Sequence, residues 1–146
     1  RLMSVRMRLY ASPTYLETNG TPVSLLDLSD HRLVCQSLNS IQVAAGATLV
    51  QHLLTSDIQH LFTVNNYFGV LQGVLNNIGI GVLPDYVTED FPDLVRVLPD
   101  LESGEVPVFL AYPEELRQSK RIAAFRDFVQ EEIFAHRRKI REATPQ

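Results

Sequence analysis

The side chains best suited to binding a ligand in this chain are amides and a hydroxyl that lie beside the ends of predicted strands and the start of a predicted helix. One group follows the strand-like run 31–36, a second precedes a helical pattern that begins at residue 67, and a third closes the strand-like run 80–83. The first turn of a helix has unpaired backbone N–H groups and carries the positive end of the helix dipole, which favours a carboxylate. The predicted ligand-binding residues are Gln36, Ser37, Leu38, Asn65, Asn66 and Pro84.

Each of these positions also has a purely structural interpretation, and the sequence leaves both open. Asn65 or Asn66 can cap the following helix without touching a ligand, which would contribute about 1 kcal/mol to folding. Gln36 and Ser37 fit the ordinary polarity of a loop equally well. Pro84 can simply stop a strand, because proline lacks the N–H that a sheet needs.

The sequence contains no pattern typical of catalysis, metal binding or cofactor binding. Its histidines fall on different predicted elements, without an i, i+4 pair or a carboxylate at ligand spacing. No nucleophile has a partner base that can be assigned from position alone. The glycines at 79 and 81 lack the third glycine of a dinucleotide fingerprint. We therefore predict a protein that is not an enzyme and holds no metal or cofactor.

Composition and charge exclude several further classes of protein. The chain has 146 residues, 45% of them hydrophobic, a formal net charge of −4 and one cysteine, Cys35. The negative charge argues against nucleic-acid binding by this part of the chain, and the basic cluster 136–141 is best explained as stabilising a helix C-terminus. No apolar run is long enough to span a membrane. Cys35 lies in an apolar run and is predicted to be a buried small residue rather than a reactive thiol.

The segment 62–84 must position most of the predicted site. Residues 62–64 alternate like a strand, and apolar residues from Tyr67 to Ile78 recur at helical spacing. Gly79 is suited to the left-handed conformation that ends a helix, and Gly81 allows a close approach within the buried strand 80–83. This order is a βαβ unit of an open α/β domain, in which ligands bind at the carboxyl ends of the strands.

The remaining elements are predicted from periodicity and from turn residues. Ser12 and Pro13 begin a short helix, and Ser119 caps the longest helix. The polar stretch 99–105 contains Gly104 and is predicted to be a loop and the boundary between two lobes. The other predictions are strands at 5–10, 31–36, 94–98 and 106–112, and helices at 14–17, 84–88 and 120–137.

Several short segments together form an ordered pattern that covers nearly the whole chain. They are residues 9–16, 19–22, 26–32, 64–66, 79–84, 94–99, 108–113 and 121–128. In this order they resemble the effector-binding domain of LysR-type transcriptional regulators. The resemblance rests on the order of the whole set and not on any single segment.

The resemblance implies an α/β fold like the type II periplasmic binding proteins. Residues 1–105 would be the second effector-binding lobe, and residues 106–146 would be the returning strand, C-terminal helix and basic tail of the first lobe. The chain begins at Arg1, so we expect a fragment that lacks the DNA-binding domain and the first half of the first lobe.

The resemblance also implies the function and the partners. We expect the sensing module of a cytoplasmic bacterial regulator, with a small, anionic co-inducer bound between two lobes. The full-length protein would be a homodimer or homotetramer that binds DNA through its N-terminal domain, with no membrane partner. The alternative is a transport-type solute-binding protein of the same architecture, which would require an export signal.

Overall fold

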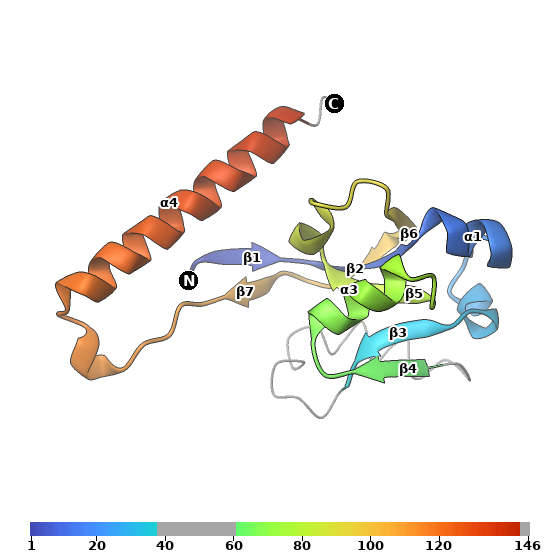
Figure 1. Cartoon of the computed structure of the whole chain (residues 1–146), viewed down its shortest axis with the longest axis horizontal. Helices are drawn as coiled ribbons and strands as arrows, with labels where there is room; N and C mark the ends of the chain where they lie inside the picture. Colours follow the sequence, from blue (N-terminus) through green and yellow to red (C-terminus); the bar gives the residue numbers. More distant parts are fainter. Residues whose placement is uncertain (38–60, 144–146) are drawn as a thin grey trace. The chain divides into compact units, whose positions relative to one another are not determined.

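The computed structural model describes residues 1–37 and 61–143 (Figure 1). The chain divides into two compact units, one of residues Val5–Val106 and one of Arg1–Ser4 with Pro107–Gln146. All predicted site residues have sequence positions within the range of the larger unit. Among the described residues, no helix combines the length and the apolar character that crossing a membrane requires.

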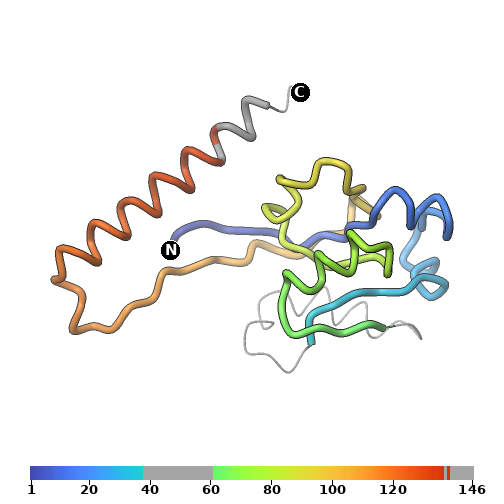
Figure 2. The backbone as a smooth tube through the Cα atoms, viewed as in Figure 1, coloured from blue at the N-terminus to red at the C-terminus, as the bar shows by residue number. Residues whose placement is uncertain are grey.

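The larger unit is built on a five-stranded mixed sheet with the order β4-β3-β5-β2-β6. β3 runs parallel to both β4 and β5, whereas β2 runs antiparallel to β5 and β6. The crossover from β4 through α3 to β5 can be followed in green in Figure 2 and is the predicted βαβ unit. In chain order the elements are β2 (Met7–Ala11), α1 (Pro13–Asn19), η1 (Leu26–Asp30), β3 (Leu33–Gln36), β4 (Leu61–Val64), α3 (Tyr67–Leu75), β5 (Ile80–Pro84), η3 (Asp85–Thr88) and β6 (Val95–Glu102).

Alternation along the strands divides the core of this unit into two clusters. The first core cluster includes Leu9 of β2 and receives Tyr15 and Leu16 of α1. The second core cluster includes Tyr10 of β2 and receives Val70 and other residues of α3. Neighbouring strand residues point to opposite faces, so α1 and α3 cover opposite sides of the sheet. Both faces are therefore buried, as expected for strands in an α/β unit.

The end of α3 differs from the prediction. The helix stops at Leu75 instead of continuing to Ile78, and Asn77, not Gly79, takes the left-handed conformation, with φ of 60°. Asparagine tolerates this conformation better than most residues. Gly79 is required for a different reason: a Cβ at this position would lie 2.2 Å from the carbonyl oxygen of Arg32. The close approach allows the Ile80 N–H to donate to that oxygen at 2.9 Å, which joins β5 to β3.

The prediction of a loop over 99–105 was wrong for its first half. β6 continues to Glu102. Its pairing with β2 shifts register between two neighbouring residues of β2: Leu9 lies opposite Val97, and Arg8 lies opposite Glu102. Glu102 accepts from Arg6 Nη1, from Arg8 Nε at 3.0 Å and from Arg96 Nη2 at 3.0 Å. These charge-assisted bonds hold a polar stretch in the sheet that its local sequence would leave as a loop.

Replacing Glu102 with glutamine should flatten the acid dependence of stability. Hydrogen bonding from Arg6, and then from Arg8, lowers the pKa of the Glu102 carboxyl below its ordinary value. A lowered folded-state pKa contributes stability above the unfolded-state pKa, and this stability is lost as the pH falls through the lowered value. We therefore measure the unfolding free energy by urea denaturation at a series of pH values from neutral to acid. This free energy should fall less steeply with decreasing pH for Glu102→Gln than for wild type. The exposed Glu17→Gln serves as the control, and equal slopes for all three proteins would contradict the role of Glu102.

The smaller unit consists of a long helix and all but one residue of each strand in a short strand pair. β1 (Met3–Val5) pairs with β7 (Val106–Val108), and η4 (Glu114–Leu116) precedes α4 (Lys120–Ala143). The strand predicted for 106–112 is shorter because its partner has only three residues. The helix extends beyond the predicted end at Arg137, since arginine, lysine and glutamate favour helix. Large apolar side chains of this unit are exposed, among them Phe109, Phe125, Phe128 and Phe134.

Candidate ligand-binding site

The parallel strands bring two of the three predicted segments together by direct pairing. Leu33 pairs with Leu61 and Gln36 pairs with Val64, so β3 and β4 end side by side. Ser37 and Asn65 are the residues that follow these two ends. β5 is parallel to β3 as well, and its carboxyl end therefore lies at the same edge of the sheet. We call this region, formed by Gln36–Ser37, Asn65–Phe68 and Pro84–Tyr86, the β3–β5 edge.

Gln36 and Ser37 are tied to the neighbouring strand. The Ser37 N–H donates to the carbonyl oxygen of Val64 at 2.8 Å. Gln36 is buried, with a side-chain exposure near 5%, and its Nε2 donates to the carbonyl oxygen of Asn65 at 3.1 Å. Gln36 thus fixes the turn between β4 and α3, while Ser37 stays partly exposed. Leu38, also predicted to bind ligand, lies outside the described residues.

Asn66 is the N-cap of α3, as the capping interpretation requires. Its Oδ1 accepts from the Gly69 N–H at 2.8 Å, and its Nδ2 donates to Asn65 Oδ1 at 2.7 Å. Both asparagines are exposed. Among the described residues, no acceptor contacts the backbone N–H of Tyr67 or Phe68, the first two residues of the helix. Within the described residues, these two N–H groups are therefore left without an acceptor, as is usual for the first turn of a helix.

Pro84 closes the edge on its other side. It is buried at the end of β5 and pairs with Met7 at the start of β2. The next residue, Asp85, binds the chain again, because its N–H donates to the Arg6 carbonyl oxygen at 2.9 Å and its Oδ1 accepts from the Arg6 N–H at 3.2 Å. Pro84 therefore shapes the edge with its backbone and leaves little side-chain surface to a ligand.

Two aromatic residues at this edge escaped the sequence analysis. Tyr67 was predicted only as part of the apolar face of the helix, and Tyr86 was not singled out. In the structure Tyr67 is the first residue of α3, half buried, and Tyr86 lies in η3 two residues after Pro84 with 44% of its surface exposed. The sequence offered one sign that Tyr67 lies at the site: it directly follows Asn65 and Asn66, the two candidate cap residues, and this position lies beside the unpaired N–H groups of the helix.

Neither a metal site nor a reactive thiol is found among the described residues. Among the residues whose side chains the structure describes, no three histidine, cysteine, aspartate or glutamate residues lie close enough together to bind a metal ion. His52 and His60 lie outside this part of the chain. Cys35 is buried, and this burial raises the pKa of its thiol to about 12, so that it stays protonated. The thiol is therefore the inert core residue that the sequence predicts.

A cavity of 520 Å³ lies at the opposite edge of the sheet. Ser12, which follows the end of β2, and Asn77, which follows α3, contribute to its wall. The charged residues that line it are Asp90 and Asp93, so its electrostatic character does not suit an anion. None of the predicted site residues that the structure describes lines this cavity.

Comparison with known proteins agrees with the fold. The family described as LysR substrate binding domain matches residues 1–133. The chain belongs to this family. The predicted periplasmic-binding-protein-like α/β fold and the resemblance to LysR-type regulators are thereby confirmed.

Individual relatives support the same assignment. The regulatory domain of CrgA, a LysR-type transcriptional regulator from Neisseria meningitidis, superimposes with a TM-score of 0.73 at 25% identity over 90% of this chain and 66% of that domain. Full-length AphB, the virulence activator of Vibrio cholerae, shares the fold with a TM-score of 0.66 at 21% identity, over 90% of this chain and 46% of AphB. An HTH-type transcriptional regulator of Haemophilus influenzae is 27% identical over 106 residues, which is 70% of this chain and 37% of the relative. The chain thus spans a minor part of the full-length regulators that it matches.

Proposed function

We propose that this chain senses a small anionic effector for a bacterial LysR-type transcriptional regulator, and that the effector binds at the β3–β5 edge. The observation that carries the proposal is the pair of unpaired N–H groups at Tyr67 and Phe68, next to the carboxyl ends of three parallel strands. A helix N-terminus of this kind stabilises a carboxylate by about 0.3–1 kcal/mol when exposed and up to about 2 when partly buried. The family and the regulator relatives favour this function over the transport alternative.

The predicted site residues receive distinct parts in this proposal. Ser37 and Asn65 are exposed enough to contact the effector directly, together with the α3 amides. Asn66 holds the helix start in place, Gln36 positions Asn65, and Pro84 shapes the wall. Leu38 completes the proposed ligand-binding set.

The wider assignment follows from family membership. Residues 1–105 would form the second effector-binding lobe, and residues 106–146 would contribute the returning strand and the C-terminal helix of the first. The full-length regulator would act in the cytoplasm as a homo-oligomer and bind DNA through its N-terminal domain. The family is one of transcriptional regulators and not of enzymes.

A titration of the ¹⁵N-labelled chain followed by NMR tests the proposed site. Butanoate should shift the amide signals of Tyr67, Phe68 and Gly69 with a Kd on the order of 1 mM, equivalent to about −4 kcal/mol. Butanamide, which has the same size and no charge, should shift them much less. Equal responses to both compounds, or butanoate shifts confined to other residues, would contradict an anion site at the start of α3.

Replacing Asn66 with alanine should weaken both folding and binding. The change removes the bond to the Gly69 N–H and frays the first turn, which costs about 1 kcal/mol of unfolding free energy. Loss of a fixed helix start should raise the Kd for butanoate in the same titration. Asn76→Ala is the matched control, because its Nδ2 donates to the Gln72 carbonyl oxygen at the other end of α3. A stable Asn66→Ala protein with unchanged butanoate affinity would remove Asn66 from the site.

A further inference from the structure

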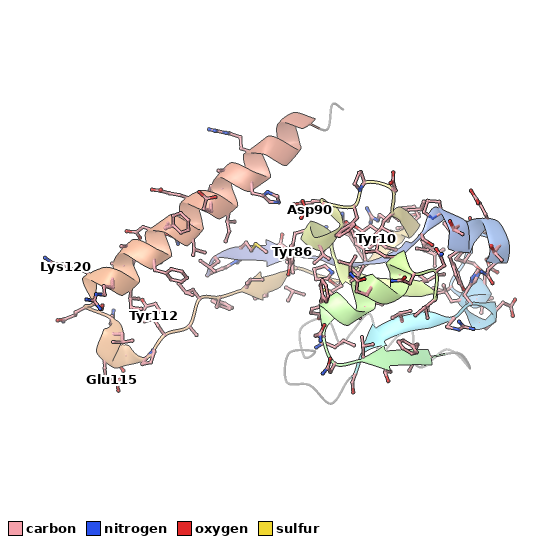
Figure 3. The ribbon with its side chains drawn as sticks, viewed as in Figure 1. Tyr10, Tyr86, Asp90, Tyr112, Glu115 and Lys120 are labelled. Carbon is pink, nitrogen blue, oxygen red and sulfur yellow. The ribbon has the colours of Figure 1, made fainter. Side chains whose placement is uncertain are left out.

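The long helix α4 carries apolar side chains on two faces that differ in exposure. Ile122, Val129 and Ile133 are partly buried. Phe125 and Phe128 are 53% and 58% exposed. At 3.6 residues per turn, the centre of their face lies about 90° around the helix from the partly buried one. Figure 3 shows the side chains of α4 projecting from the helix along its length. The smaller unit therefore leaves two large aromatic side chains of one helix face open to solvent.

Opposite charges extend this exposed face at its two ends. Arg121 lies one turn before Phe125, and Glu132 lies one turn after Phe128, so the spacing is i, i+4, i+7 and i+11. This spacing places the four side chains within about 60° of the helix circumference. Arg121 and Glu132 are exposed, and neither forms an ion pair with another described residue. We call Arg121, Phe125, Phe128 and Glu132 the α4 stripe.

The α4 stripe is complementary to a second copy of itself. If the second helix runs antiparallel, Arg121 of each copy lies opposite Glu132 of the partner subunit, and Phe125 lies opposite Phe128 of the partner subunit. The spacing of the stripe is the one through which helices pair in coiled coils. A parallel pair would instead place like charges opposite each other at both ends, which is unfavourable. The charges therefore select an antiparallel pair with twofold symmetry, in which both copies use the same surface.

We infer that the α4 stripe is a self-association surface, through which two copies of this chain pair by antiparallel contact of their α4 helices. The phenylalanines provide the apolar contact, because aromatic pairs stabilise an interface beyond the area that they bury, and the ion pairs set the orientation. The stripe is small beside the roughly 1,200–2,000 Å² of a stable interface, so we expect weak association, with a Kd on the order of 0.1 mM. The inference is independent of the proposed function, because the stripe contains no residue of the β3–β5 edge.

Charge exchange within the whole chain tests the pairing. Arg121→Glu and Glu132→Arg each place like charges opposite each other at both ends, so either variant alone should self-associate about tenfold more weakly than wild type. An equimolar mixture of the two variants restores opposite charges at both ends and should associate as tightly as wild type. The chain that carries both substitutions should do the same. Sedimentation equilibrium at low salt, with chain concentrations up to about 1 mM, measures each Kd without screening the charges.

The same measurements report the orientation of the two helices. In a parallel pair, only the mixture of the two single variants would place opposite charges together. A mixture that associates much more tightly than both wild type and the doubly substituted chain would therefore overturn the antiparallel pairing.

Substitution of the aromatic side chains tests the apolar part of the α4 stripe. Phe125→Ser combined with Phe128→Ser should abolish association over the same concentration range. Phe134→Ser is the matched control, because Phe134 is 71% exposed and lies about 140° around the helix from the stripe, and it should keep the wild-type Kd. Far-UV circular dichroism confirms that each variant keeps its helix.

Two results would overturn the inference. One is a wild-type chain that stays monomeric up to about 1 mM, ten times the Kd expected for so small a surface. The two phenylalanines would then be a surface that another part of the regulator covers. The other is association that persists unchanged in the variants of the α4 stripe, because the copies would then meet through a different surface.

Discussion

Gly79→Ala is expected to destabilise the larger unit by about 3 kcal/mol, the upper part of the range for overpacking a close-packed site. The new Cβ would lie 2.2 Å from the Arg32 carbonyl oxygen and 2.9 Å from the Arg32 carbonyl carbon. Both atoms belong to the backbone, so no side-chain rotation can relieve the contact. The strands would have to separate, which would break the bond between the Ile80 N–H and the Arg32 oxygen that joins β5 to β3.

Chemical denaturation of the chain, followed by far-UV circular dichroism, measures this loss. Gly104→Ala is the matched control, because a Cβ at Gly104 would meet no atom of the described residues within 4 Å. The control should change the unfolding free energy by less than about 0.5 kcal/mol, as surface substitutions usually do. Two variants of equal stability would contradict a close contact between Gly79 and the Arg32 carbonyl group.

Leu9→Ala is expected to cost about 4 kcal/mol, within the range of about 2–5 for removing a large side chain from a core. Leu9 is fully buried in the first core cluster, and its strand neighbours are Val82 on β5 and Val97 on β6. Neighbours on both sides belong to a hydrogen-bonded sheet, so the site can collapse only slightly around the cavity. The lost contacts and the cavity both contribute to the cost.

Leu26→Ala provides the comparison for this second variant, since 85% of Leu26 is exposed. It should lie within about 0.5 kcal/mol of wild type in the same experiment. If Leu9→Ala cost less than 1 kcal/mol beside this control, β2 would not be the interior strand, paired on both sides, that the register indicates. The position of Pro84 would then be in doubt as well, because Met7 at the start of β2 pairs with it.

The two variants matter for function because they test the scaffold of the β3–β5 edge. Gly79 sets the contact between β3 and β5, and these strands carry Gln36 and Pro84 at their carboxyl ends. A shift between the strands would move the Gln36 side chain relative to the Asn65 carbonyl oxygen that it binds. We therefore expect Gly79→Ala to weaken carboxylate binding even where the protein stays folded.

The sequence by itself determined those features that depend on neighbouring residues. The strand–helix–strand order of residues 62–84 and the Ser12 cap of α1 follow from local spacing and side-chain chemistry, and the structure has both. The sequence offered Asn65 or Asn66 as the cap of α3, and the structure uses Asn66. Cys35 was predicted to be buried because it lies in an apolar run, and it is buried. The ordered segments also indicated the family correctly, since they extend along nearly the whole chain.

The tertiary structure alone decided the features that depend on residues far apart in the chain. Glu102 keeps residues 99–102 in a strand only because Arg6 and Arg8 lie opposite it, more than 90 positions away. Gly79 has its role through the carbonyl group of Arg32, a residue 47 positions earlier on the neighbouring strand segment. Local patterns carry no information about such contacts, because strand register and order arise from the packing of the whole unit.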